Sequence, residues 1–298
     1  MRHNMVVAAL VLGSTFGSAF AADNARPANL SAIDIVAKNV ASRGGLVAWR
    51  KVQSLSFEGK LGAGGDQRGT IPSPEVAAAS GKIPSAHRLK EEAMLPFTME
   101  LQRPRKTRIE VQFRGQNAVQ VYDGTNGWKL RPFLNRLEVE PYTAHELQTA
   151  SMQSDLDGPL MDYAAKGSRV ESDGTEQVEG RQDYKLKITT KSGQVIHVWI
   201  DAQTFLESKI DGQPRELDGK MHSVEIYYRD YREVDGLKIP FVLETRVVPL
   251  APGNRATHEP PYPPEKIQID HVSVNPKLDA ARFAKPRIGD SVPHPQGL

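Results

Sequence analysis

The sequence contains no cysteine, which excludes disulfide bonds, thiolate metal sites and a lipid-modified cysteine of the lipoprotein type. It also lacks an apolar run of the roughly 20 residues that a membrane-spanning helix needs. The longest run, from about residue 5 to residue 16, follows two basic residues and precedes Ala-Phe-Ala at 19–21, which is typical of a cleavage site. We therefore expect residues 1–21 to be a signal peptide for export to the periplasm, and residues 22–298 to form one soluble domain.

Neither sign of charge dominates the composition. The formal net charge is +2, and 25% of the residues are charged. The basic cluster Arg103-Pro104-Arg105-Lys106 does not continue into a longer basic stripe, so the sequence does not indicate a nucleic-acid partner.

The common catalytic and cofactor-binding motifs are also missing, among them Gly-x-Ser-x-Gly, His-Glu-x-x-His, the P-loop and the dinucleotide fingerprint. Of the eight histidines, no two stand at i, i+2 or i, i+4 spacing. We therefore expect no enzyme activity, no catalytic residue, no metal site and no cofactor. One alternative stays open: His197 and His222, with Asp201 or Glu225 nearby, could meet across a sheet and act on a lipid-like substrate.

Most of the sequence alternates apolar and polar residues with the period of half-buried β-strands. Ten or eleven short strands at roughly ten-residue intervals, with few helices, predict a curved antiparallel sheet that is partly closed. A parallel α/β sheet is excluded because crossover helices are missing. The clearest strands expected in this way cover residues 53–60, 97–101, 109–113, 119–121, 184–188, 195–200, 205–210, 224–228, 237–247 and 267–274.

Two helices and one long insertion interrupt this pattern. Ser31 is a capping candidate ahead of apolar residues at helical spacing, and the spacing Thr143-Ala-His-Glu146 predicts a capping box at the start of a second helix. From about residue 61 to 95 the pattern gives way to glycine and proline without a period, so we expect a mobile insertion there.

The stretch VYDGTNGWKLRPF, residues 121–133, predicts a tight hairpin at Asp123–Gly127, because glycine and asparagine tolerate the backbone angles of such turns. Too few helices are predicted to cover the inner face of the sheet, so we expect part of that face to form a groove for an apolar ligand. The residues expected to line it are Leu55, Phe57, Phe97, Met99, Leu101, Ile109, Val111, Trp128, Leu130, Ile226 and Phe241.

The same stretch resembles the strand-turn-strand signature of the outer-membrane lipoprotein carrier (LolA-like) family. LQRPRKTRIEV is similar to that family's "RP" strand entry, and LDAARFAKP resembles its closing segment. The stretches IVAKNVASRGGLVAWRKVQSLSFEGK and YYRDYREVDGLKIPFVLETR resemble lipoprotein-sorting-like relatives of the carrier.

The resemblance implies a mostly β fold, in which an unclosed half β-barrel wraps around helices and holds acyl chains in an apolar cavity. It places Arg103 at the "RP" arginine, which helps to latch the lid in carriers. We accordingly expect a monomeric periplasmic carrier of lipid or acylated protein that works with a membrane donor or acceptor complex. The long insertion and the proline-rich gap near 250–264 depart from the compact carriers and leave the cargo open.

A different class of function is also compatible with the sequence. Related folds occur in periplasmic regulators, so the chain could be a sensor or interaction module that binds a partner protein.

Overall fold

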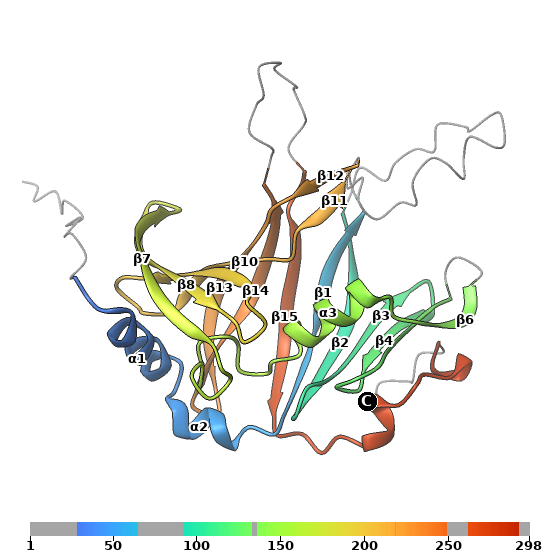
Figure 1. The fold of residues 1–298 in the computed structure, drawn as a ribbon. Helices are drawn as coiled ribbons and strands as arrows, with labels where there is room; N and C mark the ends of the chain where they lie inside the picture. The colour runs from blue at the N-terminus through green and yellow to red at the C-terminus, as the bar shows by residue number, and fades with distance from the viewer. Residues whose placement is uncertain (1–28, 65–91, 133–135, 218, 249–261, 292–298) are drawn as a thin grey trace, which may run out of the picture.

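The computed structural model describes residues 29–64, 92–132, 136–217, 219–248 and 262–291. The expected signal peptide and most of the expected insertion lie outside these residues. Three α-helices and fifteen β-strands make up most of these described residues (Figure 1). Among the described helices, none is long and apolar enough to cross a membrane.

Thirteen strands form one antiparallel sheet in the order β6-β5-β4-β3-β2-β1-β15-β14-β13-β10-β9-β8-β7. The first and last strands of the chain, β1 and β15, pair near its middle, whereas β6 and β7 stand at opposite ends and the sheet is not closed (Figure 1). The predicted mostly β, unclosed fold is therefore confirmed. The strands are β1 (Ser54–Gly64), β2 (Glu92–Gln102), β3 (Lys106–Phe113), β4 (Gln116–Tyr122), β5 (Gly127–Arg131), β6 (Arg136–Pro141), β7 (Arg169–Val178), β8 (Arg181–Thr189), β9 (Val195–Asp201), β10 (Glu207–Asp211), β13 (Val224–Val234), β14 (Leu237–Val247) and β15 (Glu265–Val274); β11 (Arg215–Leu217) and β12 (Lys220–His222) form a separate ribbon.

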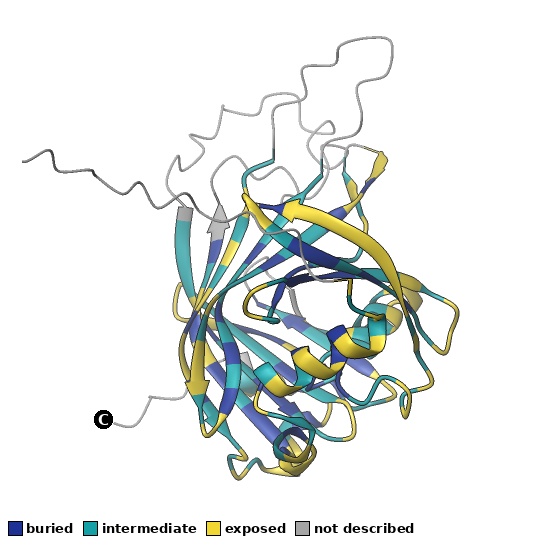
Figure 2. Ribbon diagram, turned by 90° about the vertical axis from the view of Figure 1, so that its left-hand side faces the viewer, coloured by how far each residue is buried: buried dark blue, intermediate teal, exposed yellow. Residues whose placement is uncertain are grey.

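The sheet face that carries Leu55 and Phe57, here called the inner face, is covered by a helical layer. This layer consists of α1 (Ala32–Ser42), α2 (Leu46–Lys51) and the turn-rich segment 154–167. Trp49 of α2 and Leu156 share one buried cluster with the inner faces of β1, β2, β14 and β15. A second cluster joins α1 to β8 and β9. Figure 2 shows buried residues gathered on the sheet behind α1, while the outer side of the helix is exposed.

Local sequence signals fix where the helices start and stop. The Ser31 side chain accepts a hydrogen bond from the Asp34 backbone at the start of α1. Thr143 and Glu146 form the predicted capping box of α3 (Ala144–Gln153). At the end of α1, Gly44 has a φ of 108°, and a Cβ atom there would stand 2.3 Å from the carbonyl oxygen of Gly236. Only glycine fits this approach, which holds the α1–α2 turn against the β13–β14 turn.

The boundaries of the long insertion differ from the prediction. Strand β1 continues to Gly64 and β2 begins at Glu92, with Leu61 opposite Leu95 and Gly64 opposite Glu92. Residues 61–64 and 92–95 are therefore part of the sheet. In β1 this backbone pairing overrides Gly62 and Gly64, which do not by themselves favour strand.

A buried pair of carboxyl groups lies on the outer face, between β8 and β9. Asp183 and Asp201 face each other directly in the register, and both are buried. Asp201 pairs with Arg181 at 3.1 Å, whereas Asp183 accepts a hydrogen bond from the Ser208 hydroxyl. Burial outweighs that hydrogen bond and, with repulsion from Asp201, raises the pKa of Asp183 to about 6.

We expect Asp183→Asn to stabilise the protein near neutral pH. Because the folded pKa of Asp183 lies above its ordinary value of 3.8, wild-type stability falls as the pH rises from about 4 to about 6 and stays level above that range. Removing the buried charge should raise the free energy of unfolding at pH 7 by about 1 to 2 kcal/mol, with solvent screening allowed for, and flatten the slope between those pH values. Urea unfolding at four pH values measures both effects, with Asp270→Asn on the exposed side of β15 as the control. A less stable Asp183→Asn variant at pH 7 would show that the ionised carboxylate is needed.

Candidate functional site

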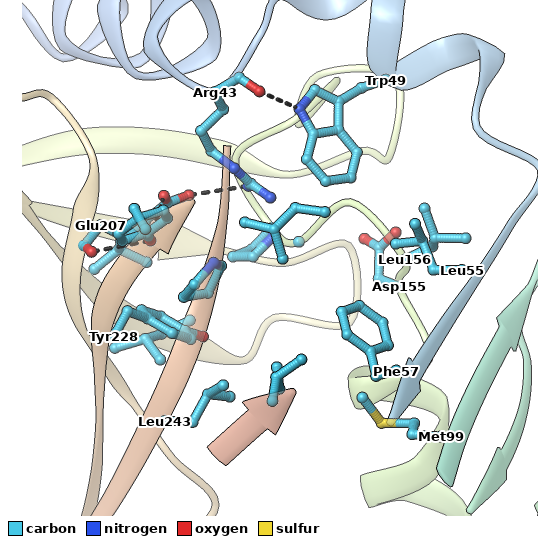
Figure 3. A pocket seen from close by; sticks show the side chains of 18 residues that line it. Arg43, Trp49, Leu55, Phe57, Met99, Asp155, Leu156, Glu207, Tyr228 and Leu243 are labelled. Atoms are coloured by element: carbon cyan, nitrogen blue, oxygen red, sulfur yellow. Dashed lines mark hydrogen bonds and ion pairs between the residues drawn. The ribbon is translucent and has the colours of Figure 1, made fainter. Parts of the chain in front are cut away.

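An apolar cavity of about 200 Å³ lies between the inner face of the sheet and the helical layer. Figure 3 shows Leu55, Phe57 and Met99 on one side of it and Tyr228 and Leu243 on the other, with Arg43 and Trp49 at one end. Apolar surface predominates in its walls, whose polar atoms belong to a few side chains. The lining residues are Arg43, Trp49, Leu55, Phe57, Met99, Asp155, Leu156, Gly158, Pro159, Val198, Glu207, Ile210, Tyr228, Tyr231, Ile239, Pro240, Leu243 and Ile269.

Three of the residues predicted to line a groove do line this cavity, namely Leu55, Phe57 and Met99. Others lie on the same inner face without reaching it. Ile109 stands opposite Met99 in the register, and Ile226 stands opposite the lining residue Ile210. The remaining inner-face residues belong to the buried cluster beside the cavity or pack against it: Phe97, Leu101, Val111 and Phe241.

The placement of Trp128 and Leu130 in the groove is wrong. The inner-face row runs from Phe57 through Met99 and Ile109 to Gln120 and Lys129, so the neighbours of Lys129 in β5 point to the other side of the sheet. There, Trp128 and Leu130 form a separate cluster with Phe283 of η4 (Ala280–Phe283). Alternation shows that two residues share a face, but it does not show which face is the inner one.

The prediction missed the part of the wall that the helical layer supplies. Trp49 is 1% exposed, and Leu156 closes the cavity from the turn-rich segment. A tryptophan in the short segment LVAWRK was the one signal in the sequence for this contact. Glu207 and Tyr228, on β10 and β13, could not be assigned because only the folded sheet brings them beside α1.

A buried ion pair lies at the end of the cavity that Arg43 occupies. The guanidinium donates a hydrogen bond from Nη1 to Glu207 Oε1 at 3.0 Å and another to the carbonyl oxygen of Asp157, and it stacks on the Trp49 ring (Figure 3). Burial disfavours its charge, but attraction to Glu207 outweighs burial and raises the pKa of Arg43. Tyr231 donates a hydrogen bond to the other carboxylate oxygen of Glu207 at 3.2 Å. Arg43 therefore remains charged in this apolar setting.

Arg103 joins the sheet to two parts of the helical layer. Its Nε donates to the carbonyl oxygen of Val52 at 2.8 Å and its Nη2 to that of Trp49 at 3.3 Å, at the C-terminal end of α2. The same Nη2 contacts Asp157 Oδ2 at 2.6 Å in the turn-rich segment. Two of these acceptors are carbonyls at the end of a neighbouring helix, and the lid-latch function of Arg103 stays a prediction.

Asp157 and Asp155 share Lys166 as a partner, at 2.5 Å and 2.7 Å. Burial alone would raise the pKa of Asp157, but hydrogen bonds from Lys166 and Arg103 outweigh it and lower the pKa. At Asp155 burial prevails over the attraction of Lys166, and its pKa is raised. Asp157 is therefore the charged anchor of the Arg103 contact.

Comparison with known proteins gives matches by structure alone. No family model matches the sequence, and no curated protein matches it. A LolA superfamily protein from Nitrosomonas europaea superposes with a TM-score of 0.51 at 11% identity, over 86% of this chain and 98% of that one. The chain has a LolA-like fold. A DUF1329 family protein from Desulfovibrio piger matches with a TM-score of 0.50 at 12% identity, over 85% and 97% of the two chains.

The LolA-like fold does not bring the two candidate histidines together. His197 lies on β9 of the main sheet, with Nδ1 at 2.7 Å from Asp211, whereas His222 lies on β12 of the separate ribbon and is 1% exposed. No group of three or more histidine, aspartate or glutamate side chains in the described part of the chain could hold a metal ion. The pairing of His197 with His222 across one sheet, on which the enzyme alternative depended, is not formed.

Proposed function

We propose that this chain is a periplasmic carrier that binds lipid or the acyl chains of an acylated protein in the cavity beneath the helical layer. The observation that carries the proposal is the cavity itself, a space lined mostly by apolar side chains that the inner face of a LolA-like sheet and the helical layer leave unfilled. Buried apolar surface of this kind is the usual feature of a site for an apolar ligand. Residues 1–21, which resemble an export signal, support the periplasmic location.

The size of the cavity implies that binding involves opening. A volume of about 200 Å³ is below the roughly 300–1,000 Å³ of pockets that enclose a drug-sized ligand. A long acyl chain therefore fits only if the helical layer moves away from the sheet. Each buried CH₂ group contributes about 0.8 kcal/mol, so a chain of about sixteen carbons gains on the order of 10 kcal/mol, part of which drives this opening.

Titration with the uncharged fluorescent dye N-phenyl-1-naphthylamine tests the proposal. A carrier should give a saturable increase in fluorescence with one site per chain, which long-chain acyl compounds reverse by competition. A signal that does not saturate, or that acyl compounds leave unchanged, would contradict an acyl-binding cavity. Recovery of a stoichiometric protein partner without lipid would support the sensor alternative instead.

A further inference from the structure

We propose that the ligand carries an uncharged carbonyl group, of an ester or an amide, and that Arg43 and Tyr228 bind this carbonyl at the polar end of the cavity. The proposal rests on the acyl-binding function proposed above and specifies the chemical class of the ligand. It means that the cavity selects acyl esters or amides over free fatty acids.

The first argument is the set of hydrogen-bond donors left over at this end. The Arg43 side chain is 10% exposed, and both hydrogen bonds that it donates to described residues come from Nη1. Its Nη2 donates none within the described part of the chain. The hydroxyl of Tyr228 likewise makes no hydrogen bond to a described residue, although the residue lines the cavity beside Leu243 (Figure 3). The Nε of Arg43 is also buried without a partner among the described residues. Donors that line a cavity without a protein acceptor indicate a ligand oxygen, and the two side chains are close enough for each to affect the pKa of the other.

The ionisation state of Tyr228 supports its role as a donor. Burial, together with the nearby charge of Glu207, raises the pKa of Tyr228 above its usual value. The hydroxyl therefore keeps its proton at any physiological pH, and it can donate to a carbonyl oxygen.

The second argument is the balance of charge around the cavity. Arg43 is paired with Glu207, Arg103 with Asp157, and Lys166 with both Asp155 and Asp157. Three basic groups thus face three acidic groups, and none of the three cations is left over to neutralise a ligand carboxylate. A free carboxylate placed here would lose the hydration of a full charge beside another carboxyl group, Glu207, whereas a neutral carbonyl has a much smaller desolvation cost and no charge to be repelled.

The third argument is that an ion pair is a poor wall for a purely hydrocarbon ligand. Burying two charges costs desolvation free energy that their attraction only partly offsets, and apolar side chains of similar volume are often as stable or more stable. A guanidinium fixed by Glu207 and stacked on Trp49 instead presents its remaining N–H groups in a set direction. That arrangement suits recognition of a carbonyl oxygen at the head of an acyl chain.

The test compares ligands that differ only at the head group. N-phenyl-1-naphthylamine, which has no carbonyl, is displaced from the full-length protein at pH 7.5 by N-methyldecanamide, methyl decanoate or sodium decanoate. We expect the amide and the ester to compete at concentrations at least about tenfold lower than decanoate. Equal or better competition by decanoate would overturn the proposal.

The Tyr228→Phe variant tests the donor directly. Loss of one hydrogen bond to a neutral acceptor should weaken the amide and the ester about 3- to 10-fold more than it weakens the dye, which has no carbonyl. Tyr227→Phe is the matched control, because the neighbouring Tyr227 hydroxyl donates to Glu225 on the outer face. If wild type does not bind the dye, the proposed function fails. If the dye binds but Tyr228→Phe leaves amide binding unchanged, only the carbonyl site fails.

Discussion

Replacing Arg103 with leucine is expected to raise the affinity of the cavity for apolar probes about ten- to a hundredfold. Arg103 donates to two carbonyl oxygens at the end of α2 and to Asp157, and these contacts hold the helical layer against the sheet. Losing a hydrogen bond that involves a charged group costs about 1.5 to 3 kcal/mol. If the closed form predominates, that loss multiplies the population of the open form, and hence the apparent affinity, by the stated factor.

The controls for this prediction lie within the same turn. Arg103→Lys should fall between wild type and the leucine variant, because lysine keeps the charge but cannot reach three acceptors with a planar fork. Arg105→Leu should bind as wild type does, since Arg105 is exposed and makes no side-chain hydrogen bond to a described residue. Probe affinity and dissociation rate are measured for all four proteins at one ionic strength. Equal values for wild type and Arg103→Leu would show that Arg103 does not act as a latch.

Replacing Met99 with glutamate is expected to weaken binding of N-phenyl-1-naphthylamine at least about a hundredfold. Met99 lines the cavity between Phe57 and Ile109 and is only partly buried, so a carboxylate there can stay hydrated while the cavity is empty. Binding an apolar ligand would strip that water from an unpaired charge, at a cost of several kcal/mol.

The matched control is Val242→Glu, on the outer face of β14. Val242 is also partly buried, but it stands opposite Arg229 in the register. The guanidinium of Arg229 can pair with a carboxylate introduced at position 242. We expect this variant to keep wild-type affinity, and circular dichroism should show that both variants are folded. If Met99→Glu unfolds while Val242→Glu does not, the position is solid core rather than cavity wall.

The strands that the sequence predicted are those that bury one face. Strands such as β8 and β14 alternate in sequence because their inner faces pack in the clusters beneath the helical layer. Strand β7 was missed, since it lies at the edge of the sheet and eight of its ten residues, from Arg169 to Gln177 apart from Val170, are exposed. An edge strand that buries little side-chain surface does not need alternating apolar and polar residues. The backbone pairing of β7 with β8 is set by the fold.

The site could be predicted less well than the fold. Alternation identified Leu55, Phe57 and Met99, but the same rule assigned Trp128 to the inner face, where the register places Lys129. The polar end of the cavity depends on pairs far apart in the chain, such as Arg43 and Glu207, which are 164 residues apart. Only the sheet order, which brings β10 next to β13 and beneath the end of α1, determines such a pair.

Mass spectrometry of what the protein carries from the cell tests the central claim most directly. The full-length chain, exported and purified without detergent, is extracted with organic solvent, and the extract is compared with that of the Met99→Glu variant prepared in the same way. We predict an acyl ester or amide in near-stoichiometric amount from wild type and its loss from the variant. Extracts that contain no apolar molecule above the level of the variant, from a protein that also fails to bind N-phenyl-1-naphthylamine, would contradict a carrier function.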